Sequence, residues 1–224
     1  MHGIHERENQ LQSLYHRLPL SNTYSKRNLR LRAHSPWLCR FAFLHLLWNQ
    51  CHCDLYRCLT PGLVESVPDT TLEQLSPTFL VRCQNRCAFY AEKVVDIITS
   101  LLQLGVKLPV LPMEIAVWAY QSIRLLIHTA HELPRERLVT YANSCSEMIR
   151  IVSDTSPAVQ QIVSVARDVF FLNTDSVRDP TSHRYLKNLQ SQSQHRSTLS
   201  GKEPWNLGLH QDKFYRSIIS SAGL

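Results

Sequence analysis

Seven cysteines and eleven histidines are the residues of this 224-residue sequence that most readily suggest chemistry. Cys51, Cys53 and Cys58 lie close together, and Cys83 and Cys87 follow in the next apolar block. A structural zinc site usually combines paired C-x2-C knuckles, and that spacing does not occur here. On a helix Cys51 and Cys53 would point about 200° apart, so the two thiols cannot converge on one ion. We therefore predict no metal site and interpret the cysteines as reduced core residues.

The histidines show two spacings that would suit a metal site in a helical bundle. His45 and His52 are seven residues apart, and His128 and His131 are three apart. Bundle metal sites usually add inward Glu or Asp in an E-x-x-H pattern, which does not accompany these histidines. We therefore interpret them as hydrogen-bonded core or surface residues rather than as a four-histidine site.

The sequence also lacks the common catalytic motifs. G-x-S-x-G, H-E-x-x-H, the Walker loop and G-x-G-x-x-G are all absent. Asp54 and Arg57 are three residues apart and form a candidate intrahelical ion pair, which more often serves structure than acid–base catalysis. We predict that the chain is not an enzyme; an all-helical enzyme with a diffuse site is the alternative.

The element that must position most of these residues runs from Ser35 to Gly62. Ser35 is a good helix N-cap, Pro36 suits the first helical position, and Pro61-Gly62 supplies a stop. About 25 residues between them contain no Pro or Gly, which corresponds to roughly 37 Å of helix. Apolar residues recur at three- and four-residue steps and cover more than a narrow stripe, so we expect a central helix packed on several sides. These residues are Phe41, Leu44, Leu47, Trp48, Cys51, Leu55, Tyr56 and Cys58.

Other apolar blocks with helical periodicity precede and follow this element, separated by prolines and polar segments. The glycines are few, six in all, and these proline-bounded blocks favour helices over short strands. We predict an all-α, multi-helix domain built on long central helices. Besides the central element, helices are predicted for residues 4–18, 78–104, 113–131, 135–152 and 156–172, with loops at 21–33, 63–76 and 107–112.

The net charge of +6 is spread unevenly along the chain. Residues 1–40 carry +5, residues 41–172 carry −2 and residues 173–224 carry +3. The predicted folded body is therefore slightly acidic and the basic residues lie in its flanks, which argues against a nucleic-acid-binding surface on the body. Four Lys or Arg residues within 26–32 form a weak phosphate-contact or nuclear-import signal, for which a solvated loop is the alternative.

Composition changes after residue 172. Residues 188–203 are rich in Ser and Gln and hold little that can be buried, which is typical of a disordered or linker-like segment. We therefore divide the chain into a helical domain, residues 1–172, and a largely disordered polar tail, residues 173–224. Apolar residues make up 44% of the chain, which is enough for one core in the first part.

The N-terminus, MHGIHERENQ, is polar and has no hydrophobic segment typical of a signal peptide. Arg40, Asp54 and Arg57 interrupt the most apolar stretch, so no run of about 18 uncharged apolar residues exists for a membrane span. An odd number of cysteines without a signal peptide favours reduced thiols. We expect a cytosolic or nuclear protein with no membrane partner.

Several separated segments resemble one known family. The string LHLLWNQCHCDLYRCLTPG, residues 44–62, resembles a helix of the fungal-specific transcription factor domain, the middle homology or regulatory region of fungal two-zinc, six-cysteine transcription regulators. Family members commonly read LHLLYHQC-x-x-x-LYR followed by Pro-Gly, and Trp48 and Asn49 stand here where Tyr and His are common. FLVRCQNRCAFYAEKVVDII (79–98) and AYQSIRLL (119–126) are similar to later segments of the family, in the same order. The resemblance covers about residues 14–172.

The resemblance implies a helical regulatory domain that acts in the nucleus on transcription by RNA polymerase II. In the family, DNA is bound by an N-terminal zinc cluster of the form C-x2-C-x6-C, which this sequence does not contain. The chain therefore resembles the C-terminal portion of such a regulator, and we expect DNA binding and zinc only through that module. No cofactor is expected in this chain itself. The partners implied are a small-molecule effector, the transcription machinery and a homodimer partner.

Four residues are candidates for an effector pocket within such a domain: Trp48, Arg57, Tyr120 and Arg124. Aromatic walls with guanidinium groups would hold an anionic metabolite. Ordinary core and surface packing is the alternative for these side chains. The alternative function is a helical protein-interaction scaffold without DNA-binding or ligand-sensing activity, which would bind partner helices through an apolar groove.

Overall fold

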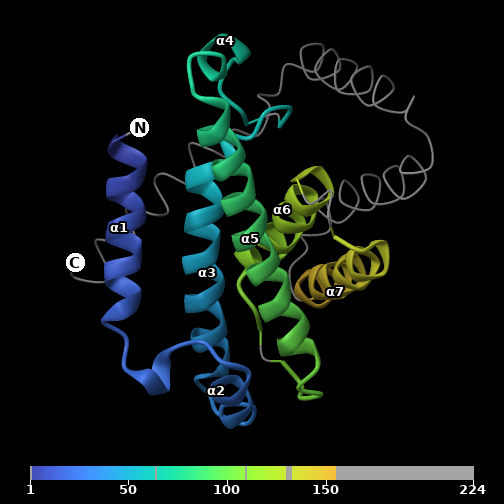
Figure 1. Cartoon of the computed structure of the whole chain (residues 1–224). Coiled ribbons are helices and arrows are strands. Elements are labelled where there is room, and N and C mark those ends of the chain that lie inside the picture. Colours follow the sequence, from blue (N-terminus) through green and yellow to red (C-terminus); the bar gives the residue numbers. More distant parts are fainter. Residues whose placement is uncertain (1, 64, 109, 130–132, 155–224) are drawn as a thin grey trace, which may run out of the picture. The chain divides into compact units, whose positions relative to one another are not determined.

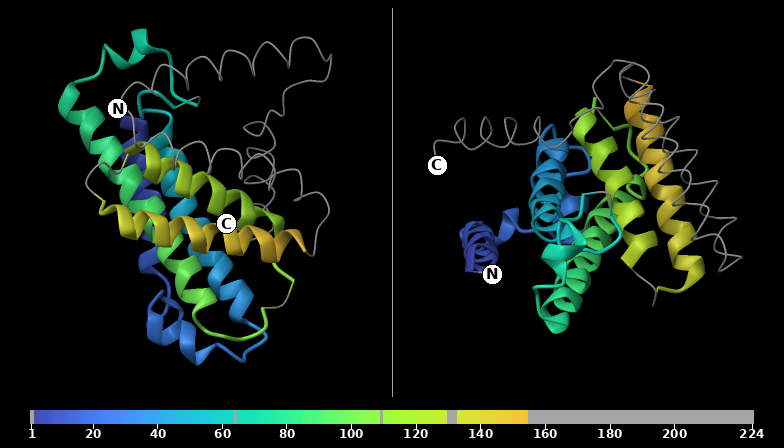
Figure 2. Two further views of the ribbon diagram at one scale, coloured as in Figure 1. Left: turned by 90° about the vertical axis from the view of Figure 1, so that its right-hand side faces the viewer. Right: turned by 90° about the horizontal axis from the view of Figure 1, so that it is seen from above.

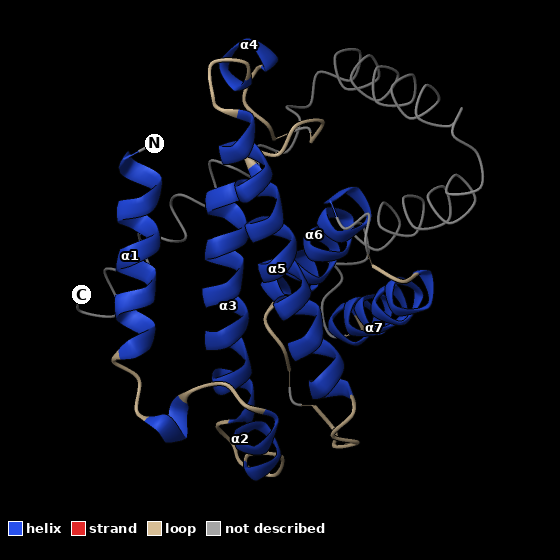
Figure 3. Cartoon of the chain, viewed as in Figure 1, coloured by secondary structure: helices blue, strands red, loops and turns tan. Residues whose placement is uncertain are grey.

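The structure is a computed structural model that describes residues 2–63, 65–108, 110–129 and 133–154. The chain divides into two units, Met1–Phe170 and Phe171–Leu224, and all described residues belong to the first. Every regular element among them is a helix and none is a strand, which confirms the predicted all-α class (Figure 3). In chain order the elements are α1 (His2–His16), the 3-10 helix η1 (Leu20–Asn22), α2 (Lys26–Leu31), α3 (Leu38–Arg57), α4 (Asp69–Leu72), α5 (Pro77–Leu102), α6 (Met113–Thr129) and α7 (Arg135–Ser153) (Figure 1).

α3 and α5 form the centre of the described unit. The two helices pack side by side, with α1 against α3 on one side and with α6 and α7 against α5 on the other (Figures 1 and 2). Cys53 of α3 and Cys87 of α5 are fully buried where the two helices meet. The Cys53 Sγ donates to the Cys87 carbonyl at 4.0 Å, and the Cys87 Sγ donates to the Cys53 carbonyl at 3.8 Å. Both thiols are therefore core packing groups.

α3 begins later than the sequence predicts. Ser35 does not cap the helix, because its Oγ accepts a hydrogen bond from the Trp37 N–H at 3.2 Å within a turn. The Leu38 N–H donates to the Ser35 carbonyl at 3.1 Å, and Leu38 is the first residue of α3. The same Ser-Pro signature does cap α5, where the Ser76 Oγ accepts a first-turn backbone N–H at 3.3 Å. One dipeptide pattern therefore closes a turn in one place and starts a helix in another.

The basic segment before α3, predicted as a loop, is helical in part. The Ser25 Oγ caps α2 by accepting the Asn28 N–H at 3.0 Å. The Asn28 Nδ2 donates to the carbonyl groups of Leu20 at 3.0 Å and Thr23 at 2.8 Å, which joins η1 to α2. Leu29 is 1% exposed and anchors α2 in the core. One buried leucine and one asparagine thus give this segment a defined path.

Residues 2–40 therefore belong to the folded body, and the prediction that their positive charge lies in a flank is wrong. Arg32 shows the reason. Its guanidinium donates to the Ser21 carbonyl at 2.7 Å and to the Asn28 carbonyl at 3.0 Å, and it lies 4.4 Å from the centre of the Phe41 ring. Charge counting assigns such a residue to solvent, whereas its apolar stem and five donors stabilise local structure.

The other predicted helices lie close to their observed bounds. α5, α6 and α7 match the blocks predicted for 78–104, 113–131 and 135–152, and the only helix in the predicted loop 63–76 among the described residues is the single turn α4. No helix in the described part of the chain is long and apolar enough to span a membrane. The predicted helix at 156–172, the domain boundary at residue 172 and the tail 173–224 lie outside the described residues.

The loop between α3 and α4 depends on Gly62, which has a φ of +83°. This left-handed conformation is disfavoured for any residue with a side chain. The loop also passes close to α6, since an added Cβ at Gly62 would lie 3.1 Å from the Cε1 of His128. Gly105, after α5, has a φ of +66° but has no atom within 4 Å of an added Cβ.

Gly62→Ala should lower the free energy of unfolding by about 2 kcal/mol, because left-handed strain and displacement of His128 act together. Gly105→Ala is the matched control, since it carries the left-handed strain alone and should cost about 1 kcal/mol. Urea denaturation of the wild type and both variants measures the two losses. Equal losses would contradict the role given to the His128 contact.

Candidate functional site

A polar stripe crosses the otherwise apolar contact between α3 and α6. Gln50, Asp54 and Arg57 lie four and three residues apart on α3, so they share one face of the helix. The Gln50 Nε2 donates to the Asp54 Oδ1 at 2.9 Å, and the Arg57 Nε lies 3.2 Å from the same oxygen. The Gln50 Nε2 also donates to the Gln121 Oε1 of α6 at 2.9 Å. The residues that we call the polar stripe are Gln50, Asp54, Arg57, Glu65, Gln121 and Arg124.

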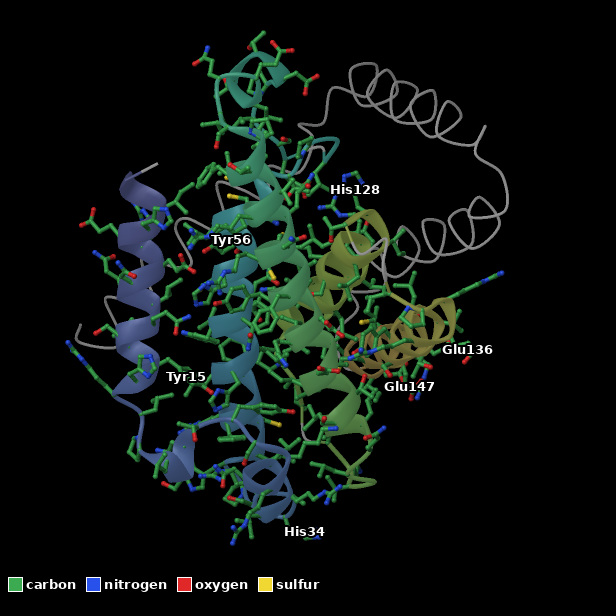
Figure 4. All side chains as sticks on the ribbon, in the orientation of Figure 1. Tyr15, His34, Tyr56, His128, Glu136 and Glu147 are labelled. Atoms are coloured by element: carbon green, nitrogen blue, oxygen red, sulfur yellow. The ribbon has the colours of Figure 1, made fainter. Side chains whose placement is uncertain are left out.

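α6 joins the polar stripe to the loop that follows α3. Arg124 forms an ion pair with Glu65 of that loop. One turn further along α6, the His128 Nε2 lies 2.8 Å from the Pro61 carbonyl oxygen (Figure 4). α6 therefore holds the loop at two points, and the path of the loop depends on both.

Charge in the polar stripe centres on Glu65. Burial raises the pKa of this carboxyl group, but the guanidinium groups of Arg124 and Arg57 outweigh burial and hold the pKa below its usual value. Glu65 is therefore an anion at neutral pH. The Arg124 Cζ lies 6.0 Å from the centre of the Tyr120 ring. Burial raises the pKa of Tyr120 and the Arg124 charge offsets part of this rise, so the phenol stays protonated.

The stripe is buried at its two glutamines, partly buried at its charged residues, and only partly hydrogen-bonded. Gln50 is fully buried and Gln121 is 6% exposed. The Gln50 Oε1, the Glu65 Oε2 and the Arg124 Nε are buried and have no hydrogen-bond partner among the described residues. Each unpaired buried polar atom costs about 1–3 kcal/mol, and partly satisfied networks weaken the packing around them. The contact between α3 and α6 is therefore held less firmly than the apolar contact between α3 and α5.

The structure brings together three of the four residues predicted for an effector pocket. Arg57, Tyr120 and Arg124 meet at the polar stripe. Trp48 lies on the opposite face of α3, because its separation of nine residues from Arg57 corresponds to about two and a half helical turns. Its Nε1 donates instead to the Leu11 carbonyl of α1 at 3.1 Å. The predicted pocket is thus divided between two sides of α3.

The Trp48 side of α3 carries a cluster of aromatic and histidine rings beneath α1. The His52 ring stacks on Tyr90 of α5, with centroids 4.0 Å apart and planes inclined by 8°, and the Trp48 ring centroid lies 4.5 Å from that of His52. Burial lowers the pKa of both His45 and His52 to about 4, so both are neutral in the folded protein. The His45 Nε2 lies 2.9 Å from the Asn22 carbonyl oxygen. Both His52 nitrogens are buried without a hydrogen-bond partner among the described residues.

The cysteines near the central contact are in their protonated form. Burial raises the pKa of the Cys51 and Cys87 thiols to about 12 and that of the Cys83 thiol to about 11. The thiolate is the form that attacks an electrophile or binds a metal, so these thiols act as apolar groups at neutral pH. No three His, Cys, Asp or Glu residues are arranged to hold a metal ion in the part of the chain that the structure describes. His131, considered above as a ligand, lies outside that part.

Gln50, Gln121 and Glu65 escape prediction from the sequence. The available signal for Gln50 is its position four residues before Asp54 within an apolar helix. Gln121 offers a similar signal, as an uncharged polar residue in the middle of an apolar block. No spacing rule links Glu65 to Arg124, because the path of a loop depends on tertiary contacts.

Comparisons of the chain with models of protein families, with curated proteins and with solved structures find no match.

Removing one partner of the Arg124–Glu65 pair leaves the other charge partly buried and uncompensated. Arg124→Met and Glu65→Gln should each lower the free energy of unfolding by about 1–3 kcal/mol. The double variant should lose about 1 kcal/mol less than the sum, as measured by urea denaturation in a double-mutant cycle. The control cycle uses Arg150→Met and Glu147→Gln, an exposed pair on α7, whose coupling should be much weaker because solvent screens both charges. Additive losses at Arg124 and Glu65 would contradict a coupled stripe.

Acid should destabilise the protein through its buried histidines. The folded-state pKa of His45 and His52, about 4, lies below the ordinary value of 6.5. Stability is therefore full above pH 6.5 and is lost as the pH falls toward 4, by up to about 1.4 kcal/mol per pH unit for each histidine. His52→Phe keeps the ring stacked on Tyr90 and should remove about half of this loss, whereas exposed His16→Gln should leave it unchanged. Urea denaturation between pH 7 and 4 measures the slope, and equal slopes for His52→Phe and the wild type would contradict the assignment.

Proposed function

We propose that this chain is a helical regulatory domain of a fungal transcription regulator, which acts in the nucleus on transcription by RNA polymerase II. The motifs at 44–62, 79–98 and 119–126 support this proposal, and they fall on α3 with its following turn, on α5 and on α6. DNA recognition and zinc binding belong, in this proposal, to the zinc-cluster module of the family. The chain described here supplies the responsive part.

The observation that carries the proposal is the polar stripe. A regulatory domain needs two packing arrangements of similar free energy. An effector shifts the balance between them only if it binds one arrangement more tightly than the other. The stripe is partly unsatisfied, joins α3 to α6 and holds the loop after α3. These are the properties of an element that can change its packing while the α3–α5 core stays fixed.

The stripe also indicates the chemistry of an effector. Glu65 forms an ion pair with Arg124, and its negative charge also interacts electrostatically with Arg57. A small carboxylate or phosphate would compete with Glu65 for these guanidinium groups, which bind planar or tetrahedral anions through paired N–H donors. Loss of the Glu65 contact would remove one of the two contacts that hold the loop to α6.

A helical interaction scaffold without ligand sensing is the second candidate function. Two surface hollows, of about 460 Å³ on α5 and about 640 Å³ between residues 33–38 and 105–108, are lined by residues outside the polar stripe. Hollows of this kind favour contact with another protein over capture of a metabolite at the stripe.

A tethered-reporter experiment tests the regulatory proposal. The full chain, fused to a bacterial DNA-binding module in a fungal reporter strain, should raise or lower reporter output relative to the module alone. Arg124→Met should shift that output, because it loosens the stripe, whereas the exposed Arg150→Met should not. Reporter output that is identical for the fusion, both variants and the module alone would overturn the proposal.

A thermal-shift screen distinguishes the two candidate functions. A regulatory domain of the proposed kind should show a saturable rise in Tm with one class of carboxylate or phosphate metabolite, by about 2.7 kcal/mol of added stability at a hundred times the Kd. The Arg124→Met variant should lose this rise and the Arg150→Met variant should keep it. A flat response across the screen favours the scaffold.

A further inference from the structure

One end of the helical bundle is basic throughout. Figure 1 shows α2, the start of α3 and the end of α5 at this end, and α4 at the other. Residues 9–53 contain six Lys or Arg and no Asp or Glu, and residues 97–113 add one Lys and again no acidic residue. We call α2, residues 32–40 and residues 103–108 the basic end. His34 marks it in Figure 4, away from Glu136 and Glu147 of α7.

Most cations of the basic end are free to meet a partner. Lys26, Arg27, Arg30 and Arg40 are exposed, and none forms an ion pair with another described residue. Arg32 alone turns inward, onto backbone carbonyls and a ring. Four exposed cations that form no ion pair with a described residue produce a positive potential that attracts anions.

The same end carries exposed apolar side chains. Leu31 and Trp37 of the basic end are 71% and 58% exposed, and Leu20 of the adjoining η1, whose carbonyl accepts a hydrogen bond from Asn28 of α2, is 87% exposed. The Arg40 guanidinium lies 4.8 Å from the centre of the Trp37 ring, which places charge and aromatic surface side by side. Exposed large apolar side chains beside unpaired cations favour an interaction surface.

A hollow separates the two segments of the basic end. It has a volume of about 640 Å³ and lies between residues 33–38 and residues 105–108, with Lys107 and His34 in its lining. Leu38 and Leu108 give it apolar walls. The surface here is thus a shallow, mostly apolar hollow with the cation Lys107 in its lining.

We infer that the basic end is a docking surface for an acidic protein segment that carries bulky apolar residues. Carboxylates of such a segment pair with Lys26, Arg27 and Arg30, and its apolar side chains cover Trp37 and fill the hollow. A nucleic-acid backbone matches the charge but leaves the exposed leucines in water. A bilayer surface matches both charge and apolar groups but is flat and cannot fill the hollow. The inference depends on this end alone and goes beyond the proposed regulatory function.

Binding of a synthetic probe tests the inference. The probe is a labelled peptide in which Asp and Glu alternate with Leu and Phe, and its fluorescence anisotropy is followed as the full chain is added. Binding should saturate, and the double variant Arg27→Glu, Arg30→Glu should weaken it about tenfold, because two attractions become repulsions. The matched control is Arg7→Glu, Arg135→Glu, which changes the net charge equally on exposed positions of α1 and α7 and should alter the Kd less than about twofold.

Further variants separate the apolar from the charged part of the surface. Trp37→Ala with Leu31→Ala should weaken the peptide several-fold at constant charge, and a peptide with Ser in place of Leu and Phe should bind as weakly to the wild type. Circular dichroism confirms that each variant is folded. Absence of saturable binding, or equal effects of the Arg27→Glu, Arg30→Glu variant and its matched control, would overturn the inference.

The same experiment also tests the two alternative partners, a nucleic acid and a membrane surface. A labelled DNA duplex and vesicles of phosphatidylcholine with phosphatidylserine are titrated with the wild type and the Arg27→Glu, Arg30→Glu variant. If the duplex or the vesicles bind more tightly than the peptide and lose affinity in that variant, the basic end serves a nucleic acid or a membrane, and the acidic segment is the wrong partner.

Discussion

α3 is buried on three sides, and the rest of the structure follows from how it meets each neighbour. Toward α5 it presents small and aliphatic side chains such as Cys53, so the two helices pack closely. Toward α1 it presents the rings of Trp48 and His52. Toward α6 it presents Gln50 and its polar neighbours. One helix thus combines a firm apolar contact, an aromatic contact and a polar contact, which differ in strength and in response to pH and to anions.

The long helices are predictable from the sequence because their signals are local. Apolar periodicity and proline boundaries place α5, α6 and α7 near their observed bounds. The path of the chain before α3 is not predictable in this way. It depends on Asn28 and Arg32, whose donors meet carbonyl groups elsewhere in the segment, and on the burial of Leu29. None of these contacts can be predicted from the pattern of charges in the sequence.

The residues of the candidate site also differ in whether local sequence signals or tertiary contacts determine their positions. Arg57 and Arg124 are recognisable as cations on helical faces, but their common partner Glu65 lies in a loop that only tertiary structure brings to them. Trp48 shows the opposite error, since a residue near in sequence can lie on the far side of its helix. Helical phase alone separates Trp48 from Arg57, because nine residues correspond to about two and a half turns of an α-helix.

The attachment of α1 has a consequence for local unfolding. α1 is held to the central helices by scattered single contacts, among them Leu11 with Trp48, Gln12 with Tyr90 and the Glu8–Arg86 ion pair. Regions with few such contacts open at a lower free energy than the core. Opening would admit water to His52, whose proton affinity then returns toward its ordinary value. Undocking of α1 is therefore coupled to proton uptake, and the amide hydrogens of this helix exchange sooner in acid than those of α5.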